Sequence, residues 1–200
     1  MRLDILYALT VFCFVSSITP GPNNLMLLAS GVNFGFQRSI PHMLGVALGF
    51  ALMVGLVGVG LDAIFSIFPA LLPTMRYLGA AYLLWLAIKL AMAGPVGDAE
   101  NSGNPLSFLG AAAFQWINPK AWVIAVSALT AYAAISEDYT RSVFVVALVF
   151  GLVTVPCIAA WVLFGTAMRR VLSNPRFVRP FNIAMALLLV ASIVPVLTES

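Results

Sequence analysis

Two prolines and a glycine interrupt the first apolar stretch of this chain, which extends over residues 5–30. The interruption reads Thr19-Pro20-Gly21-Pro22-Asn23-Asn24. Each proline removes a backbone donor and clashes with the preceding helical turn, so one helix ends here and another begins. Broken backbone inside a membrane persists only where it is buried in protein or lines a polar cavity. If the stretch crosses a membrane, the break therefore predicts a transport site.

Composition shows that a membrane is the right setting. The chain has 200 residues, of which 62% are hydrophobic and 8% are charged, and its mean hydropathy is +1.04. A typical soluble domain has about 25% charged residues, so these values predict an integral membrane protein that contacts the lipid bilayer. The net charge of +3 comes from only ten lysines and arginines. So few, without a basic face, exclude nucleic acid as a partner and indicate the positive-inside bias of membrane loops.

Six apolar segments are long enough for transmembrane helices, which need about 20 residues each. They extend over residues 5–30, 40–65, 75–93, 107–134, 142–168 and 181–197. A polar turn at 33–38 separates the first two segments, and Asn118-Pro119-Lys120 interrupts the fourth. No small-residue cleavage site follows a short apolar run at the N-terminus, so we interpret the first segment as a helix rather than a signal peptide. The expected fold class is an all-α membrane protein with six transmembrane helices.

The chain divides into two halves that together form a single transmembrane transporter domain. Residues 1–94 hold three predicted helices, a polar linker occupies 95–106, and residues 107–200 hold three more. The first helix of each half is broken at a proline, Pro20 in one half and Pro119 in the other. Three helices per half make the halves cross the membrane in opposite directions. This arrangement is typical of an inverted 3+3 repeat, in which paired broken helices indicate the binding site.

Loop charges predict the orientation in the membrane. The loops after the first, third and fifth helices hold twice as many basic residues as the opposite side. The first set comprises Arg38, Lys89, Arg169, Arg170, Arg176 and Arg179, and the second comprises Arg2, Arg76 and Arg141. Because cytoplasmic loops are enriched in lysine and arginine, we expect these three loops in the cytoplasm and both termini outside.

The two breaks form the predicted substrate-binding region. Asn118 followed by Pro119 is a typical helix start, with asparagine as the N-cap and proline at the first position, and Gly21-Pro22 can restart a helix in the same way. Each restart leaves free backbone amides and the positive end of a helix dipole at the break, which would attract a carboxylate. The polar side chains added there are those of Asn23, Asn24, Gln115 and Asn118. The alternative is a pair of proline kinks that only shape the helices.

Two charged side chains lie in or near the predicted membrane interior. Lys120 is deep in the fourth segment, and a charge at that depth indicates a functional site. We expect it to bind a substrate carboxylate or to release a proton during transport. The alternative is an ammonium that is satisfied by backbone carbonyls at the break. Asp62 lies near the outer end of the second segment, where it is either a proton-coupling group or an ordinary interfacial residue.

Other reactive residue types are scarce. Cys13 and Cys157 are too few for a disulfide framework, but they leave open a membrane thiol–disulfide electron carrier as an alternative function. The single histidine, His42, is expected to be a structural residue at the cytoplasmic entrance of the second helix. The chain has no Gly-x-Ser-x-Gly elbow and no phosphate-loop motif, which argues against an intramembrane hydrolase and against ATP hydrolysis. We therefore expect no catalytic residue, no metal site and no cofactor.

Four motifs follow one another along the chain in a specific order. They are Ile18-Thr19-Pro20-Gly21-Pro22-Asn23-Asn24, Gly35-Phe36-Gln37-Arg38-Ser39, Gly79-Ala80-Ala81-Tyr82-Leu83-Leu84-Trp85-Leu86-Ala87 and Phe114-Gln115-Trp116-Ile117-Asn118-Pro119-Lys120. They resemble the first-helix signature, the following turn, the third helix and the fourth-helix motif of the lysine exporter (LysE/RhtB) family of bacterial amino-acid efflux proteins. The resemblance covers nearly the whole chain, including its six predicted helices.

The resemblance implies a function and a location. It implies a secondary exporter, or translocator, of a small amino acid or amino-acid derivative in the bacterial cytoplasmic (inner) membrane, driven by proton antiport. The substrate and protons are then the partners, and the substrate path passes the two proline motifs. Residues 35–39, 79–82 and 181–189 look most like members that export cysteine and O-acetylserine; threonine, homoserine and leucine are further candidates. Pairs of glycines at four-residue spacing allow close helix contact within or between subunits, so a homo-oligomer is one expectation.

Overall fold

The structure is a computed structural model, and it describes residues 1–61, 104–134, 136, 138–172 and 175–191, with scattered positions between 74 and 92. These residues form helices and turns and contain no β-strand, which confirms the all-α fold class. The third predicted helix, the linker and Asp62 lie largely or wholly outside the described residues. The helices are α1 (Leu3–Ile18), α2 (Pro22–Leu56), α5 (Phe108–Phe114), α6 (Pro119–Ala128), α7 (Tyr139–Leu172) and α8 (Pro175–Ala191), and the π-helical turns η1 (Val57–Leu61) and η3 (Leu129–Ala133) follow α2 and α6.

The first predicted break is present between α1 and α2. α1 ends at Ile18, and Pro22 is the first residue of α2. Proline suits this position because an N–H at the first helical residue would have no intrahelical acceptor. Gly21 is the N-cap residue, and its backbone is extended. The predicted interruption is thus confirmed, and so is the helix restart at Gly21-Pro22.

α2 is a helical hairpin that reverses direction at Gly35. This residue has φ 77° and ψ 175°, which are not helical. The hydroxyls of Ser30 and Ser39 are 2.7 Å apart although the residues are separated by nine positions, whereas nine residues of straight helix span about 13 Å. The hairpin confirms the predicted polar turn between the first two segments. We call residues 22–34 the first arm of α2 and residues 36–56 its second arm.

Gly35→Ala is expected to destabilise the protein by about 1–3 kcal/mol, the cost of a non-glycine residue in this backbone region. A Cβ at Gly35 would meet no atom within 4 Å, so the effect would come from the backbone alone. Gly55→Ala, within the second arm and equally free of contacts, should be neutral or slightly stabilising because alanine favours a helix. Unfolding midpoints in SDS titrations measure both variants, and a midpoint for Gly35→Ala at or above that of the wild type would contradict the prediction.

The second predicted break separates α5 from α6. Three turn residues follow α5, and Asn118 then caps α6, because its side-chain oxygen accepts the Lys120 N–H at 3.2 Å. Pro119 is the first residue of α6. The predicted N-cap and the predicted first-position proline are therefore both confirmed.

Two helical stretches are long and apolar enough to cross a membrane by length and composition, Pro22–Gly60 and Tyr139–Arg169. The first includes both arms of α2, and α1 is a shorter apolar helix. The described residues therefore show part of the six predicted spans. α7 extends a few residues beyond its predicted range at both ends, and α8 starts at Pro175 rather than at 181, since proline suits the first position of a helix.

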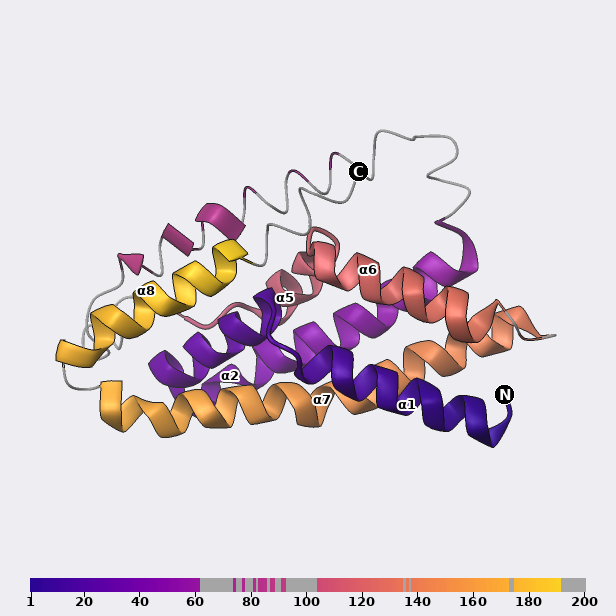
Figure 1. Cartoon of the computed structure of the whole chain (residues 1–200), viewed down its shortest axis with the longest axis horizontal. Coiled ribbons are helices and arrows are strands. Elements are labelled where there is room, and N and C mark those ends of the chain that lie inside the picture. The colour runs from indigo at the N-terminus through magenta and orange to yellow at the C-terminus, as the bar shows by residue number, and fades with distance from the viewer. Residues whose placement is uncertain are drawn as a thin grey trace.

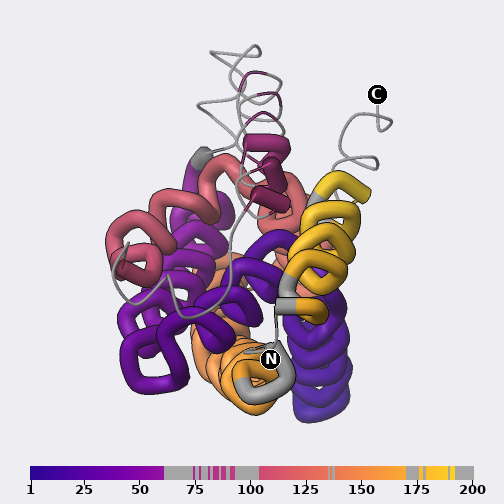
Figure 2. Tube along the Cα trace, turned by 90° about the vertical axis from the view of Figure 1, so that its left-hand side faces the viewer, coloured from indigo at the N-terminus to yellow at the C-terminus, as the bar shows by residue number. Residues whose placement is uncertain are grey.

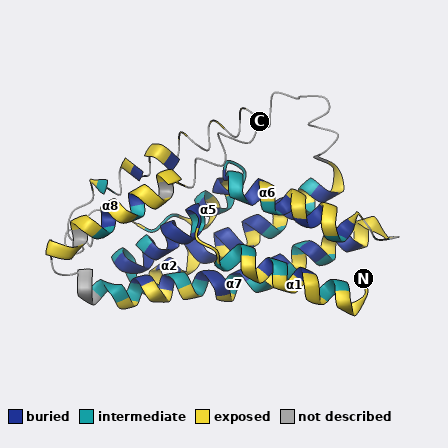
Figure 3. Cartoon of the chain, viewed as in Figure 1, coloured by how far each residue is buried: buried dark blue, intermediate teal, exposed yellow. Residues whose placement is uncertain are grey.

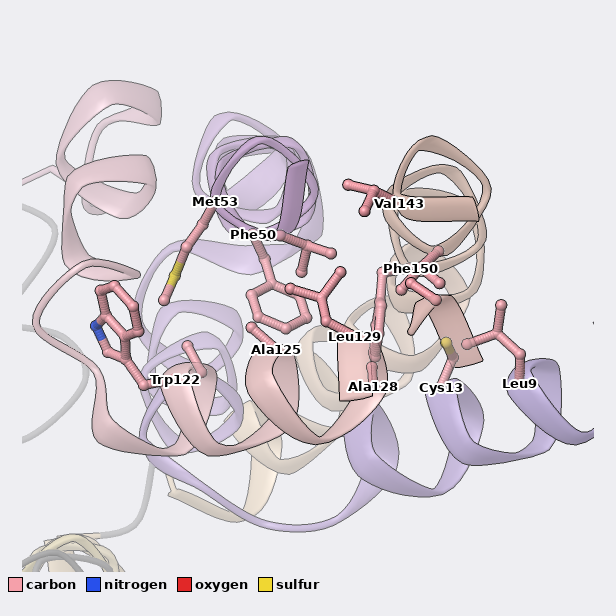
Figure 4. Packing of buried hydrophobic residues seen from close by; sticks show 14 residues of the cluster. Leu9, Cys13, Phe50, Met53, Trp122, Ala125, Ala128, Leu129, Val143 and Phe150 are labelled. Carbon is pink, nitrogen blue, oxygen red and sulfur yellow. The ribbon is translucent and has the colours of Figure 1, made fainter. Parts of the chain in front are cut away.

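The long helix α7 runs beside α1 and both arms of α2 (Figure 1). Viewed nearly end-on, the helices form one bundle with α8 at its edge (Figure 2). The main buried cluster lies where α1, α2, α6 and α7 meet, and it includes Phe50, Trp122 and Phe150 (Figure 4). The rings of Phe50 and Phe150 pack edge to face with centroids 5.0 Å apart, a favourable aromatic geometry. This core holds together the helices that contain both breaks.

The outer faces of the bundle are apolar. Leu44, Leu48 and Leu52 form an exposed stripe along the second arm of α2, and Leu148 and Leu152 do the same on α7. Figure 3 shows exposed residues along the outer edges of the bundle. Soluble monomers rarely expose contiguous apolar surface of this kind. The faces are suited to contact with lipid, in agreement with a helical membrane protein.

Candidate functional site

The two broken helices run in opposite directions and meet at their breaks. In Figure 1 the chain runs from right to left through α1 and the first arm of α2, and from left to right through α5 and α6. The contacts show the same pairing, because Tyr132 Oη donates to Ala8 O at 3.4 Å and Lys120 Nζ donates to Thr19 O at 2.6 Å. Tyr132 follows Lys120 in the chain, whereas its partner Ala8 precedes Thr19, the partner of Lys120. The two broken helices are therefore antiparallel. The two breaks therefore lie side by side.

A pair of side-chain amides joins the two broken helices next to the breaks. Asn23 Nδ2 donates to Gln115 Oε1 at 2.8 Å, and Gln115 Nε2 donates to Asn23 Oδ1 at 3.1 Å. Gln115 Nε2 also donates to Ala111 O at 2.8 Å, and the Gln115 side chain is fully buried. Side-chain amides that satisfy each other between two helices favour one relative position of those helices. The pair therefore sets the register between the two breaks.

We expect Asn23 and Gln115 to be energetically coupled. Asn23→Ala leaves the buried Gln115 amide without one of its partners, and Gln115→Ala leaves the partly buried Asn23 amide without its partner, each at a cost of up to about 1–3 kcal/mol. The double variant removes both groups, so its loss of stability should fall short of the sum by about 0.5–3 kcal/mol. Unfolding midpoints of the four proteins in one detergent give this coupling energy, with the exposed Gln37→Ala as a control for loss of an amide. Strictly additive losses would show that the two side chains do not act as a unit.

Lys120 links the second break to the end of α1. Its Nζ donates to Thr19 O at 2.6 Å and to Pro20 O at 3.2 Å. These carbonyls follow the C-terminus of α1, where the negative end of the helix dipole favours a cation. The structure thus places the ammonium against backbone carbonyls at the break, as in the alternative stated for Lys120, but these carbonyls do not use all of its donors. An ammonium has three donors, and among the described residues two of them are used.

Gly21 makes room for the Lys120 side chain. A Cβ at Gly21 would lie 2.7 Å from Lys120 Cδ and 3.0 Å from Lys120 Nζ. The backbone of Gly21 is extended, with φ −176° and ψ 178°, and any residue adopts such a conformation. Glycine therefore serves here to allow the close approach of Lys120 and not to provide backbone freedom. This contact could not be anticipated from Gly21-Pro22 as a helix start.

Asn24 satisfies backbone carbonyls that the first break leaves open, and Thr19 adds a bond within the last turn of α1. Asn24 Nδ2 donates to Ser17 O at 2.9 Å and to Thr19 O at 2.8 Å. The Thr19 hydroxyl donates to Val15 O in the last turn of α1. Carbonyls at the end of a helix have no intrahelical partner, and the Asn24 amide supplies one to Ser17 O and Thr19 O. Val15 O, in contrast, already accepts the Thr19 N–H at 3.1 Å. Both predicted site residues therefore hold the break in shape.

The N-termini of α2 and α6 differ in how they are capped. At α6 the side chain of Asn118 already accepts the Lys120 N–H. At α2 the N-cap residue is Gly21, and no side chain caps the helix. The first-turn amides of α2 therefore lack the side-chain partner that Asn118 provides at α6. The structure thus distinguishes two helix starts that the sequence treats alike.

Two further contacts at the first break come from α7 and were missed by the sequence analysis. Thr154 Oγ1 and Ser17 Oγ are 3.1 Å apart. Trp161 Nε1 donates to Ile18 O, at the end of α1, at 3.1 Å. The only sequence signal for either residue is a polar group within a strongly apolar segment. Their pairing with α1 depends on how distant helices pack.

A small pocket lies at the junction of the two breaks, with a volume of about 50 Å³, which is room for several water-sized groups. The predicted site residues that line it are Gly21, Pro22, Asn23, Asn24, Gln115, Asn118 and Lys120. The additional lining residues are Ser16, Ser17, Val46, Phe50, Ala121, Ile124, Thr154 and Ile158. Thr19, Pro20 and Pro119 adjoin the lining residues in the chain without lining the pocket themselves. Residues of both predicted halves therefore enclose one cavity.

The remaining candidates contribute less. Asp62 lies outside the described residues, so its proton-coupling role stays a prediction. Cys13 and Cys157 are buried free thiols, and Cys157 Sγ lies 3.9 Å from Phe14 O. Within the described ranges, no group of three or more histidine, cysteine, aspartate or glutamate residues is placed to hold a metal ion.

Comparison with known protein families decides the class of this protein. The family model described as LysE type translocator matches residues 14–199, which include both breaks. The chain belongs to this family. It is thus a translocator rather than an enzyme, and membership favours transport over the electron-carrier alternative.

Individual relatives of this translocator cover almost its whole length. The cysteine/O-acetylserine efflux protein of Salmonella typhimurium is 30% identical over 187 residues, which are 93% of this chain and 94% of the relative. The proteins of the same name from Escherichia coli K12 and Shigella sonnei are 30% identical over 191 residues, which are 95% of this chain and 96% of each relative. No solved structure matches the chain significantly.

Proposed function

We propose that this translocator is a secondary exporter that moves a small amino acid or amino-acid derivative out of the cytoplasm by proton antiport. Cysteine and O-acetylserine are the first candidate substrates, because relatives named for them match almost the entire chain. Threonine, homoserine and leucine are the next candidates. The proposal rests above all on one observation, a small pocket at the meeting point of two broken helices with Lys120 in its lining.

The substrate carboxylate would bind between the N-terminus of α2 and Lys120. Gly21 and Pro22 start α2 without a side-chain cap, and both line the pocket. Free amides in the first turn of a helix bind carboxylates well. The Lys120 ammonium is held on one side by the carbonyls of Thr19 and Pro20, and its third donor is available for the same carboxylate. Helix dipole and ammonium would thus act on one anionic group.

The opposite wall suits a small and weakly polar substrate side chain. Val46, Phe50, Ile124 and Ile158 provide apolar lining, and Thr154 adds a hydroxyl. A thiol or an acetyl ester fits such a wall, whereas a second ammonium would have no carboxylate to pair with among the described lining residues. A buried charge without a partner is strongly unfavourable. The composition of this wall therefore supports cysteine or O-acetylserine over lysine.

Alternating access would come from movement of one half of the protein against the other. The proposed halves are residues 1–94 and 107–200, connected by a linker at 95–106. The contact between Lys120 and Thr19 joins them at the breaks and would have to open and re-form in each cycle. The antiparallel course of the two broken helices supports a six-helix inverted repeat in the inner membrane. The charge bias of the loops supports cytoplasmic loops after the first, third and fifth helices.

Release of amino acids from loaded cells tests this proposal. Bacteria that overexpress the chain would be loaded with radiolabelled cysteine, O-acetylserine, threonine, homoserine, leucine or lysine, and their release rates compared with those of cells lacking the chain. We expect faster release of at least one small amino acid but not of lysine, and loss of this effect when the proton gradient is dissipated. A folded, inserted protein that accelerates none of the compounds would contradict the proposal. Accelerated release that persists without a gradient would reject antiport.

A further inference from the structure

His42 is the only histidine of the chain, and the structure places it in a buried position. Its side chain, on the second arm of α2, is 2% exposed. Neither Nδ1 nor Nε2 of its ring has a hydrogen-bond partner among the described residues. This differs from the expected histidine at the membrane entrance, where water or a polar neighbour would satisfy the ring.

A buried imidazole without a partner needs a physical explanation. A buried polar group that lacks a hydrogen bond costs about 1–3 kcal/mol, and an apolar side chain of similar size would avoid this cost. A transporter has at least two conformations, and a group without a partner in one conformation can gain it in another. Histidine is also the side chain that most readily gains and loses a proton near neutral pH. Both properties suit a group whose protonation changes during transport.

Hydroxyl groups lead from His42 toward the turn at Gly35. Ser39 lies three residues before His42 and therefore one turn away on the same side of the helix. Its hydroxyl lies 2.7 Å from the Ser30 hydroxyl and 2.8 Å from Gly35 O. Both serines are buried. Because a hydroxyl can donate and accept at the same time, the Ser30–Ser39 pair can pass a proton along.

In the other direction, the helix face of His42 leads to the pocket. Val46 and Phe50 follow His42 at successive intervals of four residues and therefore lie on nearly the same face of the helix. Both line the pocket at the two breaks. His42 therefore lies one turn from the pocket wall, between that wall and the hydroxyl pair.

Few charged groups face His42 from the elements around it. The second arm packs here against the first arm of α2, against α5 and against the part of α7 around Ile158 and Val162. The first arm and α5 contain no titratable residue, and that part of α7 contains only the thiol of Cys157. On its own arm Arg38 is one turn away, but it is exposed. Among the described residues, no carboxylate therefore competes for the ring.

We propose that His42 is the proton-carrying residue of the transport cycle, which takes up a proton from the pocket side and releases it through the Ser30 and Ser39 hydroxyls at the Gly35 turn. The inference rests on the proposed function, since it names the proton site of that antiport.

The proton balance of the cycle is closed. With the pocket open outward and the amino acid released, water in the pocket protonates the imidazole of His42. With the pocket open inward, the imidazolium gives this proton to the Ser39 hydroxyl oxygen. The proton that Ser39 donates to Gly35 O turns toward Ser30 and passes through its hydroxyl to water at the Gly35 turn. The neutral imidazole is regenerated, and one proton has moved inward for each amino acid that moved outward.

Transport by the purified full-length protein in lipid vesicles separates proton coupling from substrate binding. His42→Gln keeps a polar side chain of similar size that does not titrate. It should slow pH-gradient-driven transport of reduced, radiolabelled cysteine by about tenfold or more but slow cysteine exchange without a gradient by less than about twofold, as expected for loss of coupling alone. Met43→Leu, a buried neighbour without a titratable group, is the packing control and should keep both activities. Gradient-driven transport by His42→Gln at the wild-type rate would overturn the proposal.

Nitrogen NMR of the histidine-labelled wild-type protein in nanodiscs gives a second test, because the two ring nitrogen signals both come from the single histidine. We expect the protonation state of the ring to change with pH, with a midpoint that shifts when cysteine is added. A ring that keeps one protonation state throughout, with and without cysteine, would overturn the proposal even if His42→Gln fails to fold. A wild-type protein that transports none of the amino acids would instead refute the proposed function, whatever the ring does.

Discussion

Lys120→Met is expected to lower the efflux rate about a hundredfold while the protein stays folded and inserted. Among the described residues, Lys120 is the one cation that lines the pocket, and methionine keeps much of its length without the charge. Loss of one partner of a buried charge pair costs about 3 kcal/mol, which corresponds to about a hundredfold in rate or affinity. Initial efflux rates at matched expression levels, together with the affinity of the purified variant for cysteine, measure the effect.

Two further variants make this result specific. Lys89 is the only other lysine of the chain and is predicted to lie near a helix end with its ammonium in water, so Lys89→Met should change efflux by less than about twofold. Lys120→Arg keeps the charge, but a planar guanidinium does not reproduce the compact contact of an ammonium, and we expect an intermediate rate. Wild-type efflux by Lys120→Met would mean that the ammonium only closes the end of α1 and that the carboxylate binds elsewhere.

The backbone of the site follows from local sequence. Pro20, Pro22 and Pro119 each prevent a continuous helix, and Asn118 is a strong N-cap, so both breaks and both helix starts could be predicted without tertiary information. The reversal at Gly35 was also predictable from local sequence, because Gly35 lies in a polar stretch between two apolar segments. Each of these features depends on residues only a few positions apart.

The walls of the pocket depend on contacts between distant segments. Thr154 and Ile158 lie on α7, and nothing in the neighbouring sequence shows which side of that helix faces α1 and α2. The depth of Lys120 predicted a functional cation, but the carbonyls that hold it depend on how α1 meets α6. His42 was expected at the membrane entrance because of its place in the second segment, whereas the hairpin at Gly35 folds the first arm back beside it and contributes to its burial.

Gly21→Ala is expected to lower the efflux rate by about tenfold or more, equivalent to about 1.4 kcal/mol, with little loss of stability. The new Cβ would lie 2.7 Å from Lys120 Cδ, closer than real side chains approach, so the lysine must move. A flexible side chain can move at small cost, but its ammonium would then leave the carbonyls of Thr19 and Pro20. Gly55→Ala, whose Cβ would meet no atom within 4 Å, is the matched control and should export at the wild-type rate.

Combining Gly21→Ala with Lys120→Met separates two explanations of that loss. If the alanine acts by displacing the ammonium, it has nothing to displace in the methionine background, and the double variant should be no slower than Lys120→Met alone. The coupling energy would then equal the whole effect of Gly21→Ala, as expected for residues in direct contact. If the alanine instead disturbs the amides at the N-terminus of α2, the two losses should multiply. Multiplying losses would contradict the inference that Gly21 serves to position Lys120.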